Sequence, residues 1–323
     1  MKNLRSYYNV NDGGILFAFA VAAILIYQVI LGLALDATSQ AYLWAYSFGA
    51  PLLFVLTVVG GSLIMRINPL EAIPVKRMLK PWDAGRIVIL ALLAVFAFLP
   101  IATGVQWVFG KMGYHATPTY ADYSSVWWKM LLGLVGMALL PAVGEEFLLR
   151  GAVYGSIRGK GTVYAIVLSA LLFAILHGSP VQFIHQFLIG CIMAFLIYQT
   201  GSIWASVLFH FVNNALVIIY EFAYTASGAT YLIPWWGFLI MFVVATPVLV
   251  FVLVKTGIRK SMSADGEVIP TVAAPSLGKG GEWWSKRGDY VPYQPNPKPI
   301  SLYIAFAITM AIWLANTIAG WKS

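Results

Sequence analysis

The sequence predicts an all-α protein, a polytopic transmembrane helical bundle of about nine membrane-spanning helices. Of its 323 residues, 60% are hydrophobic and only 10% are charged. A soluble protein of this length needs more charge than that to cover its surface. Apolar runs of about 20 residues also recur along the chain, and this is the helix length that crosses the hydrocarbon core of a bilayer. The mean hydropathy of +0.82 agrees with a chain that lies mostly in lipid.

Nine segments are apolar enough to be such helices. The first has no clear cleavage site after it and is too long for the apolar part of a signal peptide, so we expect a retained helix. The first three have no ionisable residue at their centres, which suits packing and lipid contact. In chain order, the nine segments lie near residues 14–35, 42–65, 87–110, 131–157, 162–177, 181–199, 202–226, 231–254 and 301–320.

Basic residues are unevenly distributed between the two ends of these segments. If the N-terminus is cytoplasmic and the segments alternate in direction, the 20 Lys and Arg residues fall at the inner side except Lys111, Lys129 and Lys322. Cytoplasmic loops of membrane proteins carry such an excess. We therefore expect a cytoplasmic N-terminus and an outer C-terminus. The net charge of +8 then reflects topology and does not indicate nucleic-acid binding.

The chain divides by composition into five parts. A long stretch after the eighth segment is rich in Gly, Pro and basic residues, as is typical of a cytoplasmic linker. The predicted parts are N-terminal membrane helices (1–124), a catalytic core (125–226), an additional membrane helix (227–254), the linker (255–299) and a C-terminal membrane helix (300–323).

The first chemical motif is "GEEFLLR", which places three ionisable residues inside an apolar run. Charges within a membrane are costly, so they indicate a functional site. Glu146 and Arg150 stand one helical turn apart, a spacing that suits a supporting ion pair. Glu145 points about 100° away and has no partner at that spacing. We therefore expect Glu145 to act as the general base.

Two further segments carry histidines at helical spacing. Phe173 and His177 lie one turn apart, and so do His210 and Asn214. The imidazole and carboxamide of the second pair can both donate hydrogen bonds to a developing oxyanion. Together with Glu145, these residues form a water-activating pair that faces an oxyanion-stabilising pair. Such a set is typical of amide hydrolysis.

Other hydrolytic chemistries lack their motifs. The sequence contains no H-E-x-x-H, no G-x-S-x-G, no serine in an obvious pairing with a histidine, and no two aspartates within the apolar segments. No cofactor is expected, but an alternative in which Glu145, His177 and His210 hold zinc stays open, since histidine and carboxylate are common zinc ligands. His185 and Glu221 also lie within apolar segments, and we expect them to support the site rather than to react.

The three motifs, in this order, resemble those of the CAAX prenyl endopeptidase and bacteriocin-processing (CPBP) family, which includes the Ras-converting endopeptidase. Its signature is E-E-x-x-x-R, then F-x-x-x-H, then H-x-x-x-N, each on its own helix. The sequence has Glu145-Glu146-x-x-x-Arg150, Phe173-x-x-x-His177 and His210-x-x-x-Asn214. The resemblance covers roughly residues 125–226.

This resemblance implies a glutamic intramembrane protease in a cell membrane, expected to be bacterial. Glu145 and His177 would then activate water, while His210 and Asn214 would stabilise the oxyanion. The implied partners are the lipid bilayer and a peptide or protein substrate that is lipidated or embedded in the membrane, with no nucleic acid. Eukaryotic members remove the last three residues of prenylated proteins, whereas bacterial members include peptide-processing and immunity proteins.

Two other functions remain as alternatives. A non-catalytic immunity or scaffold protein would use the same fold without the chemistry. A proton-coupled transporter would use Glu145, His210 and Glu221 as a relay, but the sequence shows no inverted repeat of broken helices of the kind many transporters have.

Overall fold

The computed structural model describes residues 4–114, 122–124, 126–228, 233–255 and 298–322, and within these ranges the chain is helical with no β-strand. The predicted all-α class is confirmed. Nearly all of the predicted 255–299 linker lies outside the described residues. The helices are α1 (Asp12–Ala34), α2 (Gln40–Ile64), α3 (Pro69–Ala72), α4 (Pro81–Lys111), α5 (Trp127–Gly133), α6 (Leu140–Glu146), α7 (Tyr154–Ile157), α8 (Thr162–Leu176), α9 (Pro180–Thr200), α10 (Ile203–Ser227), α11 (Trp235–Lys255) and α13 (Ile300–Lys322).

Eight of the helical stretches in the described part of the chain are long and apolar enough to cross a membrane. The predicted segment 162–177 forms helix α8, which ends within one residue of the predicted end; its 15 residues span about 22 Å, less than the other apolar helices. The sequence "HGSP" explains this end, because Gly178 adopts a left-handed φ of 67° and Pro180 opens α9. The protein is therefore an integral multi-pass membrane protein, and its described residues include eight long apolar helices and the shorter apolar helix α8.

Residues 127–160 form one long helical stretch that contains two wider turns. π-Helical segments at Leu134–Leu139 and Phe147–Val153 flank α6, which carries both glutamates. A π-turn hydrogen-bonds from i to i+5, which shifts the helix register and turns the following side chains. The first of these segments therefore affects the direction of the acidic side chains in α6, and the second affects the side chains that follow it.

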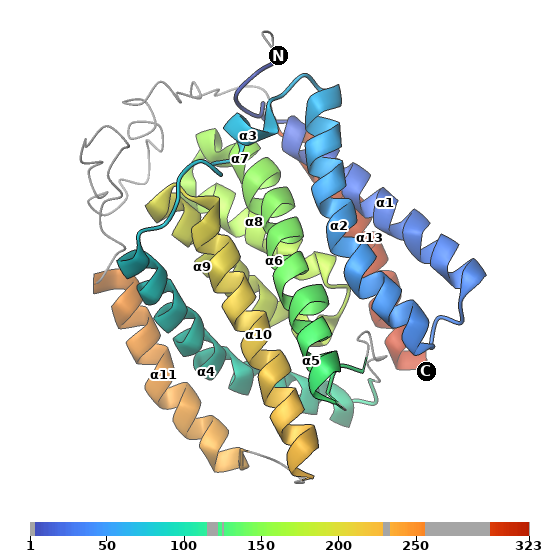
Figure 1. The fold of residues 1–323 in the computed structure, drawn as a ribbon, viewed down its shortest axis with the longest axis vertical. Helices are drawn as coiled ribbons and strands as arrows, with labels where there is room; N and C mark the ends of the chain where they lie inside the picture. The colour runs from blue at the N-terminus through green and yellow to red at the C-terminus, as the bar shows by residue number, and fades with distance from the viewer. Residues whose placement is uncertain (1–3, 115–121, 125, 229–232, 256–297, 323) are drawn as a thin grey trace.

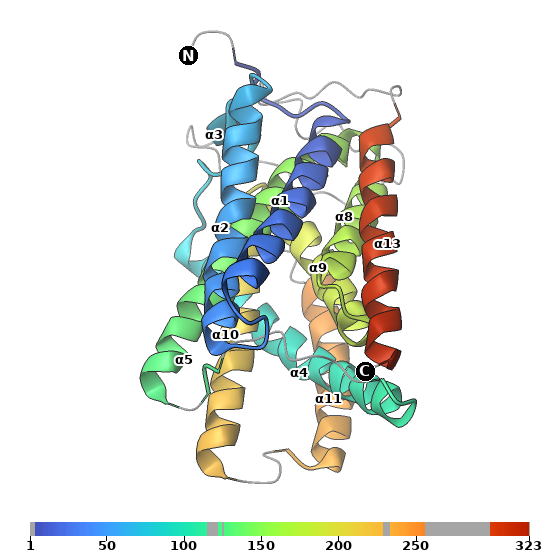
Figure 2. The same ribbon diagram turned by 90° about the vertical axis from the view of Figure 1, so that its right-hand side faces the viewer.

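The helices that carry the three motifs lie in the centre of the bundle (Figure 1). Helices α1, α2 and α13 pack on one side of them, and α4 and α11 pack together on the other. Figure 2 shows that the start of α1 and the end of α13 lie at opposite ends of the molecule. Large apolar side chains such as Leu33 and Ile64, both 85% exposed, cover the outside of the bundle, as expected for a surface in contact with lipid.

Glycines bring the central helices close together. A Cβ atom on Gly144 would lie 2.4 Å from the backbone oxygen of Pro51, so α6 and α2 can approach only because this residue is glycine. A Cβ atom on Gly190 would lie 3.0 Å from the Cα of Ala170, at the contact between α9 and α8. Small residues at helix contacts are typical of membrane bundles.

The start of α10 is held by the extended segment that follows α3. The backbone N–H of Ile203 donates to the carbonyl of Pro74 at 3.3 Å, and the indole Nε1 of Trp204 donates to the carbonyl of Val75 at 2.7 Å. The first N–H groups of a helix have no hydrogen-bond partner within the helix, and this segment supplies an acceptor for one of them. The contacts fix α10, which carries His210, against the surface segment.

Candidate active site

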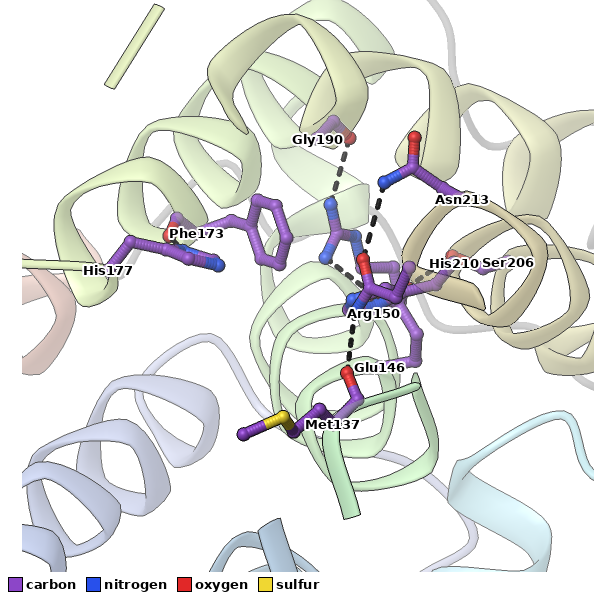
Figure 3. Close-up of polar contacts among 10 residues, drawn as sticks. Met137, Glu146, Arg150, Phe173, His177, Gly190, Ser206, His210 and Asn213 are labelled. Carbon is purple, nitrogen blue, oxygen red and sulfur yellow. Dashed lines mark hydrogen bonds and ion pairs between the residues drawn. The ribbon is translucent and has the colours of Figure 1, made fainter. Parts of the chain in front are cut away.

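Glu146 lies at the centre of a buried polar network at the end of α6 (Figure 3). Its side chain is 0% exposed, and its Oε1 accepts hydrogen bonds from Arg150 Nη1 at 2.9 Å and from His210 Nδ1 at 3.0 Å. The hydroxyl of Ser206 donates to Oε2. A buried carboxylate needs such partners, because leaving it unpaired would cost several kcal/mol.

Arg150 connects this network to α8 and α9. Its Nη2 donates to the carbonyl of Gly190 at 2.9 Å, and its guanidinium carbon lies 4.7 Å from the ring centroid of Phe173. The same ring contacts the imidazoles of His177 and His210, with centroid distances of 4.7 and 5.6 Å. Phe173 is therefore the shared neighbour that brings the motif residues of three helices together.

His177 lies just beyond the end of α8. Its Nδ1 is 2.8 Å from the carbonyl oxygen of Phe173, one turn earlier. A carbonyl only accepts, so Nδ1 must carry the proton, and in the neutral ring the lone pair is then on Nε2. The Nε2 atom of His177 can accordingly accept a hydrogen bond from water.

Glu145 differs from its neighbour in the hydrogen bonds of its carboxylate. Its Oε2 is buried and makes no hydrogen bond with the residues that the structure describes, whereas both oxygens of Glu146 accept hydrogen bonds. Glu145 interacts electrostatically with His210 and Arg150, and His177 interacts with the same two residues. The four side chains therefore occupy one region.

Asn214 contacts the first π-helical segment. Its Nδ2 donates to the carbonyl of Met137 at 3.3 Å, and its Oδ1 accepts from Asn213 Nδ2 at 3.3 Å. A carboxamide nitrogen has two hydrogens, so the bond to Met137 leaves a second one. Asn214 follows His210 by one turn of α10, as the sequence predicts.

The two residues expected to support the site differ in position. His185 interacts electrostatically with His177 and with the backbone of Gln182. Glu221 is exposed and accepts a hydrogen bond from the hydroxyl of Tyr123 at 2.7 Å. Because it follows His210 by 11 residues, it lies about 16 Å farther along α10. The structure thus brings His185 to the site but not Glu221.

Several site residues were missed from the sequence. From the sequence, no serine was expected to pair with a histidine. In the structure, Ser206 lies one turn before His210, and both side chains donate hydrogen bonds to the carboxylate of Glu146. The spacing of Ser206, His210 and Asn213 along one helix was the available signal. No sequence signal pointed to the backbone carbonyls of Met137 and Gly190, because any residue can supply a backbone oxygen.

The predicted zinc alternative needs three ligands around one point. Within the part of the chain that the structure describes, no three His, Cys, Asp or Glu side chains are arranged to hold a metal ion. In this arrangement Nδ1 of His210 is already bound to Glu146, and Nδ1 of His177 faces Phe173. Only their Nε2 atoms would be left as ligands beside Glu145.

The fold and the site together define a class: a multi-pass helical membrane protein with buried glutamate, histidine and arginine side chains from several helices. Residues 126–216 match a family model described as Rce1-like, type II CAAX prenyl endopeptidase Rce1-like. The match spans all three motifs, so the resemblance to the CPBP family is confirmed for this segment. Because this is a protease family, the match supports an enzyme with CAAX-type intramembrane protease activity.

Comparison with curated proteins gave no match for the chain. Comparison with solved structures gave none either.

Proposed function

We propose that the protein is an intramembrane endopeptidase of the glutamic type, in which Glu145 and His177 activate water and His210 and Asn214 stabilise the oxyanion. The observation that carries this proposal is the buried Oε2 of Glu145, which has no hydrogen-bond partner among the described residues and lies within electrostatic range of His210. Buried polar groups are almost always hydrogen-bonded, so an unsatisfied one next to a histidine cluster suggests a place for water or substrate.

The two water-activating groups have complementary roles. The free oxygen of Glu145 accepts a proton from the attacking water. His177 presents Nε2 as an acceptor, since Phe173 holds the proton on Nδ1. A water molecule has two hydrogens, so one can be oriented by His177 while the other passes to Glu145.

The chemical step is balanced as follows. The water oxygen forms a bond to the peptide carbonyl carbon as Glu145 takes one of its protons, and the carbonyl oxygen becomes an oxyanion. The spare amide hydrogen of Asn214 and Nε2–H of His210 donate to that oxyanion. The C–N bond then breaks, and the proton held by Glu145 passes to the leaving amine.

His210 requires a second proton for this role. Its Nδ1 donates to the carboxylate of Glu146, so a neutral ring would present only a lone pair at Nε2. The imidazolium form donates from both nitrogens. Glu146 is placed to compensate its charge, as a carboxylate does for the histidine of a serine-protease triad.

The substrate class follows from the family and from the location of the site. We propose a peptide bond close to the membrane, in a lipidated or membrane-embedded peptide or protein, with prenylated CAAX-type sequences as the first class to test. The match of residues 126–216 to a CAAX prenyl endopeptidase model supports this choice of substrate class.

The test compares membrane and secreted peptides from cells that carry the wild-type protein or Glu145→Gln at matched expression. We expect a precursor to accumulate in the variant, because the amide cannot take a proton from water. Glu221→Gln is the matched control, since that exposed side chain lies away from the site. Identical peptide profiles in wild type and Glu145→Gln would contradict the proposal and favour a non-catalytic role.

A further inference from the structure

Ser206 is the donor to the second oxygen of Glu146. It is 0% exposed, lies on α10 one turn before His210, and donates its hydroxyl to Glu146 Oε2. His210 binds the other oxygen of the same carboxylate through Nδ1 at 3.0 Å. Two residues of one helix face therefore hold the two oxygens of a carboxylate that comes from a different helix (Figure 3).

We propose that Ser206 is a positioning residue for His210, which fixes Glu146 so that Nε2 of the imidazole faces the reacting atoms. The inference rests on the proposed function. The terminal torsion of a glutamate is broad, so a carboxylate held at one oxygen can turn. Arg150 and His210 both bind Oε1, at 2.9 and 3.0 Å. Only the contact from Ser206 anchors Oε2 among the hydrogen bonds found in this network.

Removing the Ser206 hydroxyl leaves a buried carboxylate oxygen without its donor. The carboxylate then turns toward another donor, and the Nδ1 of His210 loses a fixed acceptor. Hydrogen bonds to charged groups are worth more than neutral ones, and the loss corresponds to about a 10- to 100-fold effect. His210 donates its hydrogen bond to the oxyanion and not to the ground-state carbonyl. Misplacing His210 therefore weakens the binding of the transition state and not that of the substrate.

The experiment measures cleavage by purified, lipid-reconstituted protein carrying Ser206→Ala, Ser206→Thr or Ser169→Ala. We expect kcat to fall at least 10-fold in Ser206→Ala with KM unchanged, and Ser206→Thr to restore most of it because the hydroxyl is kept. Ser169→Ala is the matched control, since this buried serine of α8 donates only to the carbonyl of Ile166 at 3.2 Å. It should retain the wild-type kcat.

A second readout does not need activity. Solid-state NMR of ¹⁵N-histidine-labelled protein in lipid reports which nitrogen of His210 is protonated. We expect both nitrogens of His210 to be protonated in the wild type, with Nδ1–H hydrogen-bonded to Glu146, and a weaker Nδ1–H hydrogen bond in Ser206→Ala. If Ser206→Ala fails to accumulate, Ser206→Cys keeps the volume with a weaker donor and should show the same changes in reduced form.

The outcomes separate this inference from the proposed function. A wild-type kcat and a wild-type NMR signature in Ser206→Ala would overturn the role of Ser206, while cleavage by the wild type would leave the protease assignment standing. If the wild type cleaves no substrate, the protease assignment fails. The Nδ1–H hydrogen bond of His210, read by NMR, then decides on Ser206 alone.

Discussion

At the scale of single residues, two adjacent glutamates have different surroundings. Glu146 is paired with Arg150, as its spacing predicts, whereas Glu145 keeps a buried oxygen without a partner. The difference between them was predictable because the i, i+4 rule acts within one helix. The bond from Glu146 to His210 was not, since it joins distant helices whose relative rotation no local pattern specifies.

Removing Arg150 should destabilise the protein strongly. Arg150→Ala leaves Glu146 buried without its guanidinium partner, which costs about 3–5 kcal/mol. Reversible unfolding in mixed micelles measures this loss. Arg86→Ala is the control, because Arg86 is partly exposed and lies 3.9 Å from Asp83, so its pair is worth about 1 kcal/mol or less. Equal losses in both variants would show that the buried pair is not structurally important.

At the scale of helices, the apolar segments were predictable, and their partners were not. Composition placed each apolar helix to within a few residues, although α4 begins at Pro81 and not near residue 87, and "HGSP" explains where α8 ends. Hydrophobicity is nearly uniform around the central helices, so it cannot show which face meets which neighbour. The π-turns on either side of α6 also have no recognisable sequence signal, although each changes the direction of the side chains that follow it.

The contact between α6 and α2 should depend on Gly144. In Gly144→Ala the new methyl group would lie 2.4 Å from the Pro51 carbonyl, so one helix must move. We expect a loss of about 1–3 kcal/mol and reduced cleavage, because Glu145 moves with α6. In Gly104→Ala the methyl meets nothing within 4 Å, so the higher helix propensity of alanine should leave stability unchanged or higher. If Gly144→Ala is as thermally stable as Gly104→Ala, the close contact between α6 and α2 at Gly144 is contradicted.

At the scale of the whole molecule, the charge distribution and the helix directions lead to one expected topology. The start of α1 and the end of α13 lie at opposite ends of the bundle (Figure 2). The sequence predicts which end is cytoplasmic through its basic residues. If the start of α1 is on the cytoplasmic side, the end of α13 lies outside the cytoplasm. This orientation remains a prediction.

Cysteine labelling tests this topology. In a Cys191→Ser background, Lys111→Cys should react with a membrane-impermeant thiol reagent in intact cells, and Lys76→Cys only after permeabilisation. Both lysines are exposed and lie at the ends of the fold that we assign to opposite sides. The reverse labelling pattern would place the N-terminus outside.

The central claim is that Glu145 and His177 activate water. Its most direct test is the rate of peptide cleavage by purified protein in liposomes, with the accumulated precursor or a prenylated CAAX-type peptide as substrate. We expect Glu145→Gln and His177→Ala each to lower kcat by about 10²–10⁴, the range typical of general acid–base catalysis, while Glu221→Gln cleaves at the wild-type rate. Wild-type cleavage by Glu145→Gln or by His177→Ala would contradict the claim.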